Sequence, residues 1–216
     1  MDQETEARRS IGVAILAKAP IAGLAKTRLI PHLGAAGAAA LQGWLLRRAV
    51  ATAVAAQLGP VSLWCAPDEH HADFIACQGL GAGLLRRQPE GNLGQRMNLA
   101  VVDSPTAAGT LVIGTDCPVL SVQCLRQAAD QLRQHDATVV PAEDGGYVLI
   151  GMRRAWPEIF QDVDWSTPRV MAQTRQRLSA AKLRWSELPP LWDVDRGEDF
   201  ARLVALYPEL SSLITE

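Results

Sequence analysis

Short apolar runs alternate with stretches of helical length along the first two-thirds of the chain, and this alternation limits the folds open to it. The first run, IGVAIL (11–16), is almost continuously apolar, which is typical of a strand buried on both faces of a parallel sheet. Further strands are expected at 61–66, 84–88, 110–114, 137–140, 147–151 and 183–185. Helices are expected at 35–57, 67–77, 92–102, 121–135, 167–181 and 198–206. The pattern predicts an α/β protein whose mostly parallel sheet is covered by helices on both faces.

The size and composition of the chain are those of a globular protein. It has 216 residues, of which 48% are hydrophobic and 20% charged, so it can bury a sizeable core. No repeat or composition break divides it, and we expect one domain over residues 11–216 after a disordered segment over residues 1–10. The first segment lacks the apolar core of a signal peptide, and no apolar run approaches the ~20 residues of a membrane span. These features predict a cytoplasmic protein without a membrane span.

Charge and motif content exclude several functional classes. The formal net charge is −2 and no run of Lys or Arg would follow a nucleic-acid backbone, so nucleic acid is not the expected partner. The four cysteines form no Cys-x-x-Cys pair and are predicted to be reduced thiols in or near the core. The histidines lack zinc-site spacing and no Gly-x-Ser-x-Gly elbow is present, which argues against a structural zinc site and an α/β hydrolase. The sequence gives no indication of the oligomeric state.

A basic, glycine-containing loop, AKAPIAGLAKTRL (17–29), directly follows the first expected strand. It carries Lys18, Lys26 and Arg28, and ligands of open α/β sheets bind at the carboxyl ends of the strands. Backbone N–H groups and convergent cations in such a loop favour the binding of a polyphosphate. The loop matches neither the Walker A nor the Gly-x-Gly-x-x-Gly pattern. The alternative is a solvated basic loop with no ligand.

Carboxylates occur in two places where they could hold a divalent cation. Asp116, in GTDCP, lies just past a buried strand, and Asp193 and Asp195 belong to the acidic segment WDVDRGED. Residues two apart on an extended strand point to one face, so Asp193 and Asp195 can act together. Mg²⁺ or Mn²⁺ needs only one or two carboxylates when substrate phosphates complete its coordination. The alternatives are a turn or capping role for Asp116 and capping of the last helix by the acidic segment.

The segment AEDGGYVLIG places Asp144, Gly145 and Gly146 directly before an expected strand. Asp-Gly and Gly-Gly favour positive φ, so a tight hairpin turn is the leading interpretation from spacing alone. The functional alternative is a close approach of the backbone to a ligand, with Asp144 and Tyr147 presenting polar tips to it.

Two further segments combine helix starts with polar side chains. In GNLGQRM, Asn92 precedes a helix that carries Arg96, so the pattern fits either a helix cap or an anion site. The segment DWSTPRV (164–170) fits a capped helix start with Pro at the first helical position.

Taken in order, these motifs resemble one family. Their order resembles that of an uncharacterised glycosyltransferase-like group within the nucleotide-diphospho-sugar transferase superfamily. The motifs are, in order, AKAPIAGLAKTRL, GNLGQRM, GTDCP, AEDGGYVLIG, DWST and WDVDRGED. Its members are often associated with radical-SAM or selenium-domain gene neighbourhoods. The group is similar to the 2-phospholactate guanylyltransferases and, more distantly, to the molybdenum-cofactor guanylyltransferases. The resemblance extends over nearly the whole chain, from about Val13 to Leu206, and implies a three-layer α/β sandwich of the GT-A type with a mostly parallel mixed sheet.

The resemblance also implies roles for individual residues. The expected metal ligands are Asp116, Asp193 and Asp195, and the expected catalytic residues are Lys26, Arg28 and Asp144. The residues expected to contact the nucleotide or substrate are Ala17, Lys18, Gly23, Lys26, Arg28, Asn92, Arg96, Gly145, Gly146 and Tyr147. The aspartate pair of many glycosyltransferases is reduced here to Asp116-Cys117-Pro118, which leaves the metal geometry open.

The sequence therefore predicts a transferase that uses Mg²⁺ or Mn²⁺ and a nucleotide-activated donor, with a small molecule as the acceptor. The leading hypothesis is a glycosyltransferase acting on a nucleotide-diphospho-sugar. The alternative is a guanylyltransferase-like nucleotidyltransferase that releases pyrophosphate, which the basic loop favours. A third hypothesis is a binding or regulatory protein that has kept the fold and lost turnover. The donor base, the sugar and the acceptor are not indicated.

Overall fold

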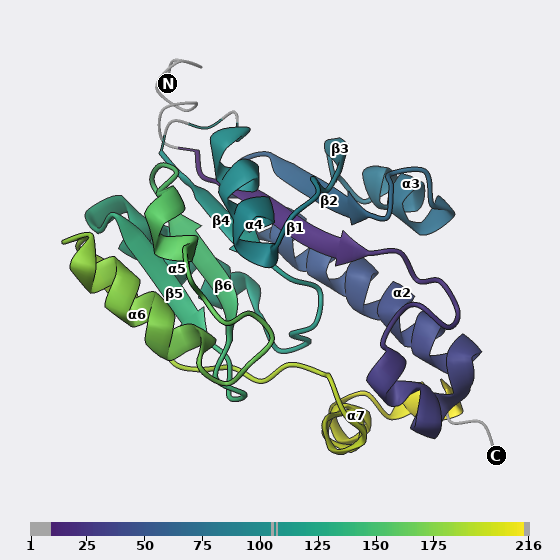
Figure 1. Cartoon of the computed structure of the whole chain (residues 1–216). Coiled ribbons are helices and arrows are strands. Elements are labelled where there is room, and N and C mark those ends of the chain that lie inside the picture. The colour runs from purple at the N-terminus through teal and green to yellow at the C-terminus, as the bar shows by residue number, and fades with distance from the viewer. Residues whose placement is uncertain (1–9, 105, 107, 214–216) are drawn as a thin grey trace.

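The protein is built on a seven-stranded mixed sheet (Figure 1). The computed structural model describes residues 10–104, 106 and 108–213, so the expectation of a disordered segment over 1–10 falls almost wholly outside the described residues. The strands are β1 (Gly12–Lys18), β2 (Val61–Ala66), β3 (Leu84–Arg87), β4 (Thr110–Ile113), β5 (Ala137–Pro141), β6 (Tyr147–Met152) and β7 (Trp185–Glu187). Their order is β3-β2-β1-β4-β6-β5-β7, and β6 runs antiparallel to β4 and β5 while the other pairs are parallel. The predicted mostly parallel sheet is confirmed.

Helices cover both faces of this sheet, which gives the predicted three layers. The helices are η1 (Thr27–Leu29), α2 (Ile30–Ala56), α3 (Ala72–Gly79), α4 (Leu93–Val102), α5 (Val122–Gln134), η2 (Pro157–Phe160), α6 (Val170–Ala180), α7 (Gly197–Leu206) and η3 (Pro208–Leu213). Side chains of β1 alternate between the faces: Val13 and Ile15 pack with α2, α3 and α5, whereas Ala14 packs with α4 and α6. A third apolar cluster joins α7 and η3 to the first half of α2.

Four element boundaries differ from the predictions for identifiable reasons. Helix α2 contains one turn, over residues 30–33, before the predicted start at residue 35, and Gly34 (φ 66°, ψ 169°) separates this turn from the rest of the helix by a kink. Helix α3 begins at Ala72 rather than at residue 67, because His71 caps it there by accepting from the N–H of Asp73. Helix α6 begins at Val170, after Pro168, with no side-chain cap, so the proline is not its first helical residue. Strand β7 lies two residues later than expected because it pairs with β5 from Ala137 onward.

Helix α2 accounts for the most apolar stretch of the chain. Within the described residues, the helical stretch Thr27–Ala56 is long and apolar enough to cross a membrane by length and composition alone. More than half of its most apolar window, 56%, is buried inside the protein. Its buried side chains pack against the sheet, so it has the environment of a core helix.

The parallel pairing of β1 and β4 brings two of the predicted site segments together. Ile15 lies opposite Ile113 in the register of these strands. Both strands run in the same direction, so the loop that begins at Ala17 and the loop that contains Thr115 leave the sheet side by side. The basic loop and the GTDCP segment therefore share one edge of the sheet.

Candidate functional site

A cavity of about 690 Å³ opens at this carboxyl edge of the sheet. Its walls come from the ends of β1 and β4, the start of α4, the start of β6 and the segment before α7. The predicted site residues that line it are Ala17, Lys18, Lys26, Arg28, Asn92, Arg96, Asp116, Tyr147, Asp193 and Asp195. Of the described residues that were predicted for the site, Gly23, Asp144, Gly145 and Gly146 do not line it.

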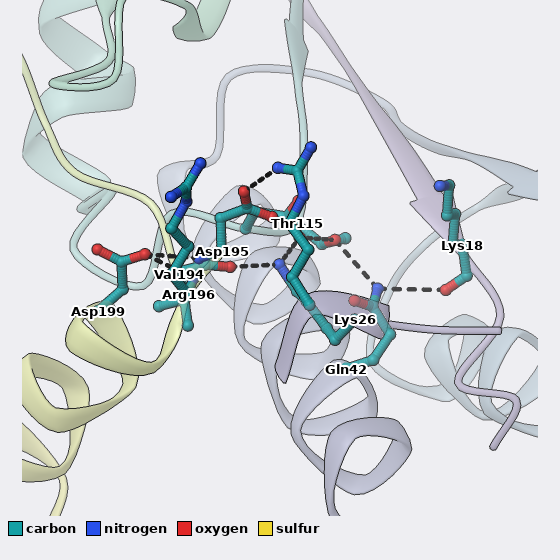
Figure 2. A network of polar contacts seen from close by, with 10 residues as sticks. Lys18, Lys26, Gln42, Thr115, Val194, Asp195, Arg196 and Asp199 are labelled. Carbon is teal, nitrogen blue, oxygen red and sulfur yellow. Dashed lines mark hydrogen bonds and ion pairs between the residues drawn. The ribbon is translucent and has the colours of Figure 1, made fainter. Parts of the chain in front are cut away.

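Lys26 joins three separate segments at the cavity wall (Figure 2). Its Nζ lies 2.7 Å from Asp116 Oδ1 and donates to the carbonyl oxygen of Val194 at 2.6 Å. The backbone N–H of Val194 donates in turn to the carbonyl oxygen of Asp116 at 2.8 Å. The Lys26 side chain is only 6% exposed, so this charge depends on the Asp116 carboxylate for compensation. Its backbone is left-handed (φ 48°), a conformation that a non-glycine residue keeps only when its surroundings hold it.

A second ion pair closes the same wall from the C-terminal side. Arg28 pairs with Asp195 across a partly exposed contact. The carboxylate that supports the start of α7 belongs to Asp199, which accepts from the backbone N–H groups of Asp195 and Arg196 at 3.0 and 2.7 Å (Figure 2). The Asp195 side chain is therefore directed to the basic loop.

Asp193 lies in a site of unbalanced negative charge. The pKa of its carboxyl is raised from 3.8 to about 6, chiefly by burial and then by the charges of Asp144 and Asp116, against a smaller opposing effect of Lys26. A carboxyl with this pKa is partly protonated near neutral pH, because nearby positive charge is too weak to compensate its ionised form. Asp144 does not line the cavity, but its charge affects the site by raising the pKa of Asp193.

The donor atoms around Asp116 and Asp193 suit a divalent cation completed by other ligands. Asp116 Oδ1 is engaged by Lys26 and Thr115, whereas Oδ2 has no hydrogen-bond partner among the described residues. The Asp116 side chain is 51% exposed. Within the described part of the chain, no cluster of three or more Cys, His or carboxylate side chains is arranged to hold a metal ion. Two carboxylates with water and phosphate oxygens form the coordination that Mg²⁺ favours, so the residues fit such a group only together with a substrate.

The start of α4 forms the opposite wall. Asn92 caps this helix by accepting from the N–H of Gln95 at 2.9 Å, and Gln95 returns a bond to the N–H of Asn92. The predicted cap is therefore confirmed. Arg96 is held by the carbonyl of Gly91 at 3.1 Å and by the side chain of Gln88 at 3.3 Å, so its guanidinium borders the cavity.

The Asp144-Gly145-Gly146 segment forms the tight turn between β5 and β6. Asp144 Oδ1 accepts from the N–H of Gly146 at 2.8 Å, and Gly145 has φ 93°. A Cβ on Gly145 would lie 2.3 Å from the carbonyl oxygen of Pro168, so the turn packs tightly against the segment before α6. Tyr147 presents its ring to the cavity, but its hydroxyl donates to Met97 Sδ at 3.7 Å and burial raises its pKa. Its polar tip thus faces the protein interior.

Several residues at the cavity were not predicted from the sequence. Thr115, Cys117, Gln88, Trp165 and Ser166 line it, as does the side chain of Gln42 from the middle of α2. Burial raises the pKa of Cys117 to about 12. The sequence marks Gln42 only as one polar residue within an apolar stretch of α2, and a single such residue sets no periodic pattern. Trp165 and Ser166 belong to the DWST motif of the family resemblance, to which no site role was assigned, and they line the cavity from the loop before α6.

Comparison with known protein families identifies the chain. Residues 49–167, just over half of the chain, match a family described as an uncharacterized protein conserved in bacteria (DUF2064). The chain belongs to the DUF2064 family. A search of curated proteins gives no significant match to this DUF2064 protein.

Solved structures share the fold of the DUF2064 protein. A structure described as a candidate nucleotide-diphospho-sugar transferase from Desulfovibrio desulfuricans G20 is 24% identical with a TM-score of 0.77, over 94% of this chain and 95% of that one. A CMP:2-keto-3-deoxy-manno-octonic acid synthetase complexed with CTP is 14% identical with a TM-score of 0.57, over 93% and 99%. Rv0371c from Mycobacterium tuberculosis H37Rv, in complex with manganese, is 16% identical with a TM-score of 0.50, over 91% and 99%. At these low identities the similarity establishes the fold alone.

Proposed function

We propose that this protein is a metal-dependent transferase that passes the sugar of a nucleotide-diphospho-sugar to a small-molecule acceptor. One observation carries the proposal: Lys26, Asp116 and Asp193, from three distant segments, meet at a single cavity at the carboxyl edge of the sheet. A cavity lined by both cations and under-compensated carboxylates has the charges that a diphosphate and its divalent cation require.

In this proposal the cations divide the work of binding phosphate. Lys18 is exposed and its ammonium has no hydrogen-bond or ion-pair partner among the described residues, so it can turn to the diphosphate. Arg28 is partly exposed and can share its guanidinium between Asp195 and a phosphate oxygen. When the sugar–oxygen bond breaks, negative charge grows on the departing diphosphate, and these cations stabilise it.

The carboxylates would hold Mg²⁺ or Mn²⁺ beside the diphosphate. Asp116 offers the unpartnered Oδ2, and Asp193 offers a carboxylate whose ionised form needs positive charge. We assign Asp195 instead to orienting Arg28, because that ion pair already engages it. The bound cation would supply neutralisation of the phosphate charge. Asp144 acts in this scheme through its charge on Asp193, since it does not line the cavity.

Nucleotidyl transfer is the second candidate, and the basic loop favours it. In that reaction a nucleoside triphosphate loses pyrophosphate. Three cations in one loop suit a leaving group that carries this much negative charge. Fold similarity to a synthetase that was solved with CTP supports the same candidate.

Nucleotide binding tests the proposal directly. We expect one or more of the common nucleoside diphosphates to raise the melting temperature of the wild-type protein, and to raise it further when Mn²⁺ is present. Asp116→Asn should remove the part of the shift that depends on Mn²⁺ and should also lower the melting temperature without ligand, because it leaves the buried Lys26 ammonium without its carboxylate. Asp130→Asn is the matched control, since Asp130 pairs with Arg133 on the surface of α5. Equal Mn²⁺-dependent shifts in all three proteins would contradict the proposed site.

Product analysis then separates the reactions. Release of a nucleoside diphosphate from a nucleotide-sugar supports glycosyl transfer, and release of pyrophosphate from a nucleoside triphosphate supports nucleotidyl transfer. Metal-dependent binding without either product would favour a binding protein that has lost turnover.

A further inference from the structure

A buried amide on α2 connects the two strand ends that form the cavity. Gln42 is 3% exposed, and every other buried side chain or glycine of α2 is apolar. Its Nε2 lies 3.2 Å from the carbonyl oxygen of Lys18 and 3.2 Å from Thr115 Oγ1 (Figure 2). An amide in an apolar layer must be hydrogen-bonded to be tolerated, and here both of its N–H groups are directed to the site.

The partners of Gln42 fix the direction of each hydrogen bond. The carbonyl oxygen of Lys18 can only accept, so the NH₂ group and not the amide oxygen of Gln42 must face it. The second N–H of the same group then donates to Thr115 Oγ1. Because that hydroxyl oxygen accepts from Gln42, its own proton is available for Asp116 Oδ1, which lies 3.1 Å away.

We propose that Gln42 is a positioning residue that acts through Thr115 to orient the Asp116 carboxylate for the divalent cation. This inference rests on the proposed function. Thr115 and Lys26 both donate to Oδ1 of Asp116, so together they hold Oδ2 toward the cavity. Thr115 is itself 5% exposed, so the relay is shielded from water that could replace its hydrogen bonds.

Gln42 also ties the orientation of Asp116 to the position of the basic loop. The same amide group holds the backbone of Lys18 at the end of β1 and the Thr115 hydroxyl after β4. The cationic loop and the carboxylate are thereby fixed relative to each other by one side chain. Groups that hold a metal ligand in place in this way commonly change metal affinity by about 10- to 100-fold when they are removed.

Mn²⁺ binding, measured by electron paramagnetic resonance in the presence of a nucleoside diphosphate, tests the relay. Gln42→Met keeps the side-chain length and removes both donors, and Thr115→Val keeps the shape and removes the hydroxyl. Each should weaken Mn²⁺ binding by about 10- to 100-fold. The double variant should bind Mn²⁺ only slightly more weakly than the single variant with the lower Mn²⁺ affinity, since both changes break one chain of contacts.

Rescue and control variants separate positioning from general damage to the fold. Thr115→Ser retains the hydroxyl and should restore most of the Mn²⁺ affinity. Thr138→Val removes another fully buried hydroxyl, bonded to Ser186 on β7, and should lower stability without changing Mn²⁺ affinity. Nucleotide affinity without metal should change by less than about twofold in Thr115→Val, because this variant keeps the bond from Gln42 to the Lys18 carbonyl and alters only the branch that ends on the metal ligand.

The outcomes distinguish this inference from the function on which it rests. Wild-type protein that binds no Mn²⁺ with any nucleoside diphosphate would overturn the proposed function and the relay with it. Wild-type binding with unchanged affinity in Thr115→Val, or in Gln42→Met, would overturn the relay alone. Equal losses of nucleotide affinity with and without metal in Thr115→Val would also overturn the relay, because they would show that Thr115 has a structural role only.

Discussion

Replacing Asp193 with asparagine should stabilise the nucleotide-free protein at neutral pH. The carboxyl has a pKa near 3.8 when unfolded and about 6 in the folded protein. Below the lower value it is protonated in both states and costs nothing; as the pH rises toward 6 the folded state increasingly resists ionisation, so stability falls. Above about pH 6 the full cost is present. Asparagine carries no charge at any pH and removes that cost.

The magnitude follows from the size of the pKa shift. A rise of roughly two units corresponds to a ceiling of about 3 kcal/mol in the free energy of unfolding, at about 1.4 kcal/mol per unit. Asp193 is only partly buried, so solvent screening reduces the expected gain to about 1–2 kcal/mol. In a protein of this size such a gain raises the melting temperature by roughly 3–6 °C.

Thermal unfolding in EDTA, at several pH values between about 4 and 8, measures this effect. The advantage of Asp193→Asn over the wild type should grow as the pH rises through 4–6 and then level off. Asp130→Asn, on the surface of α5, should show no such profile. A variant that is less stable than the wild type at neutral pH, or an advantage that does not depend on pH, would show that the negative charge at Asp193 is compensated and would refute the reasoning.

Three further predictions concern the turn, the lysine and the thiol at the site. Gly145→Ala should lower the free energy of unfolding by more than about 2 kcal/mol, because Gly145 has φ 93° and its Cβ would meet a carbonyl oxygen at 2.3 Å. Gly146→Ala should lower the free energy of unfolding less, because the nearest atom to its Cβ is a side-chain oxygen of Asp144 at 3.2 Å. Urea titration of both variants measures the difference. Lys26→Met should raise the low Mn²⁺ affinity expected of the nucleotide-free protein by at least about tenfold, because it removes a positive charge beside the Asp116 carboxylate that repels the cation, and should weaken nucleotide binding; lower Mn²⁺ affinity would contradict this charge effect. Cys117 should react with iodoacetamide more than about 100-fold more slowly in the folded than in the unfolded protein at mildly alkaline pH, because burial raises its pKa to about 12; mass spectrometry of the labelled peptide measures this.

The central strands were predictable because they are buried on both faces and leave nearly continuous apolar runs in the sequence. Strand β4 is buried at every position and β1 at most of its positions, which is why TLVI and IGVAIL were recognisable. The strand order and the antiparallel direction of β6 were not predictable, because they depend on pairing between distant segments. The kink at Gly34 was also missed, since a lone glycine before an Ala-rich stretch carries no mark of its φ angle.

At the site, the meeting of the basic loop with Asp116 was predictable because both follow neighbouring parallel strands. The nearness of Asp193 to Asp116 was expected from the family resemblance and not from any local pattern, because it depends on the pairing of Val194 with the backbone of Asp116. The Gln42 relay was missed because a single amide within a long helix gives no periodic signal. The assigned roles of these residues remain predictions for the experiments above.

The bond from Lys26 to Val194 spans 168 positions of sequence, and this separation has a consequence for how the protein is made. Chains leave the ribosome from the N-terminus onward, so β1 and α2 emerge well before the acidic segment is synthesised. Until then the Lys26 ammonium lacks its partner, the carbonyl oxygen of Val194, which precedes α7. Packing of α7 against α2 later holds that segment in place. A nascent chain can assemble most of its sheet while one wall of the pocket is still missing, so a cellular nucleotide cannot guide the early steps of its folding.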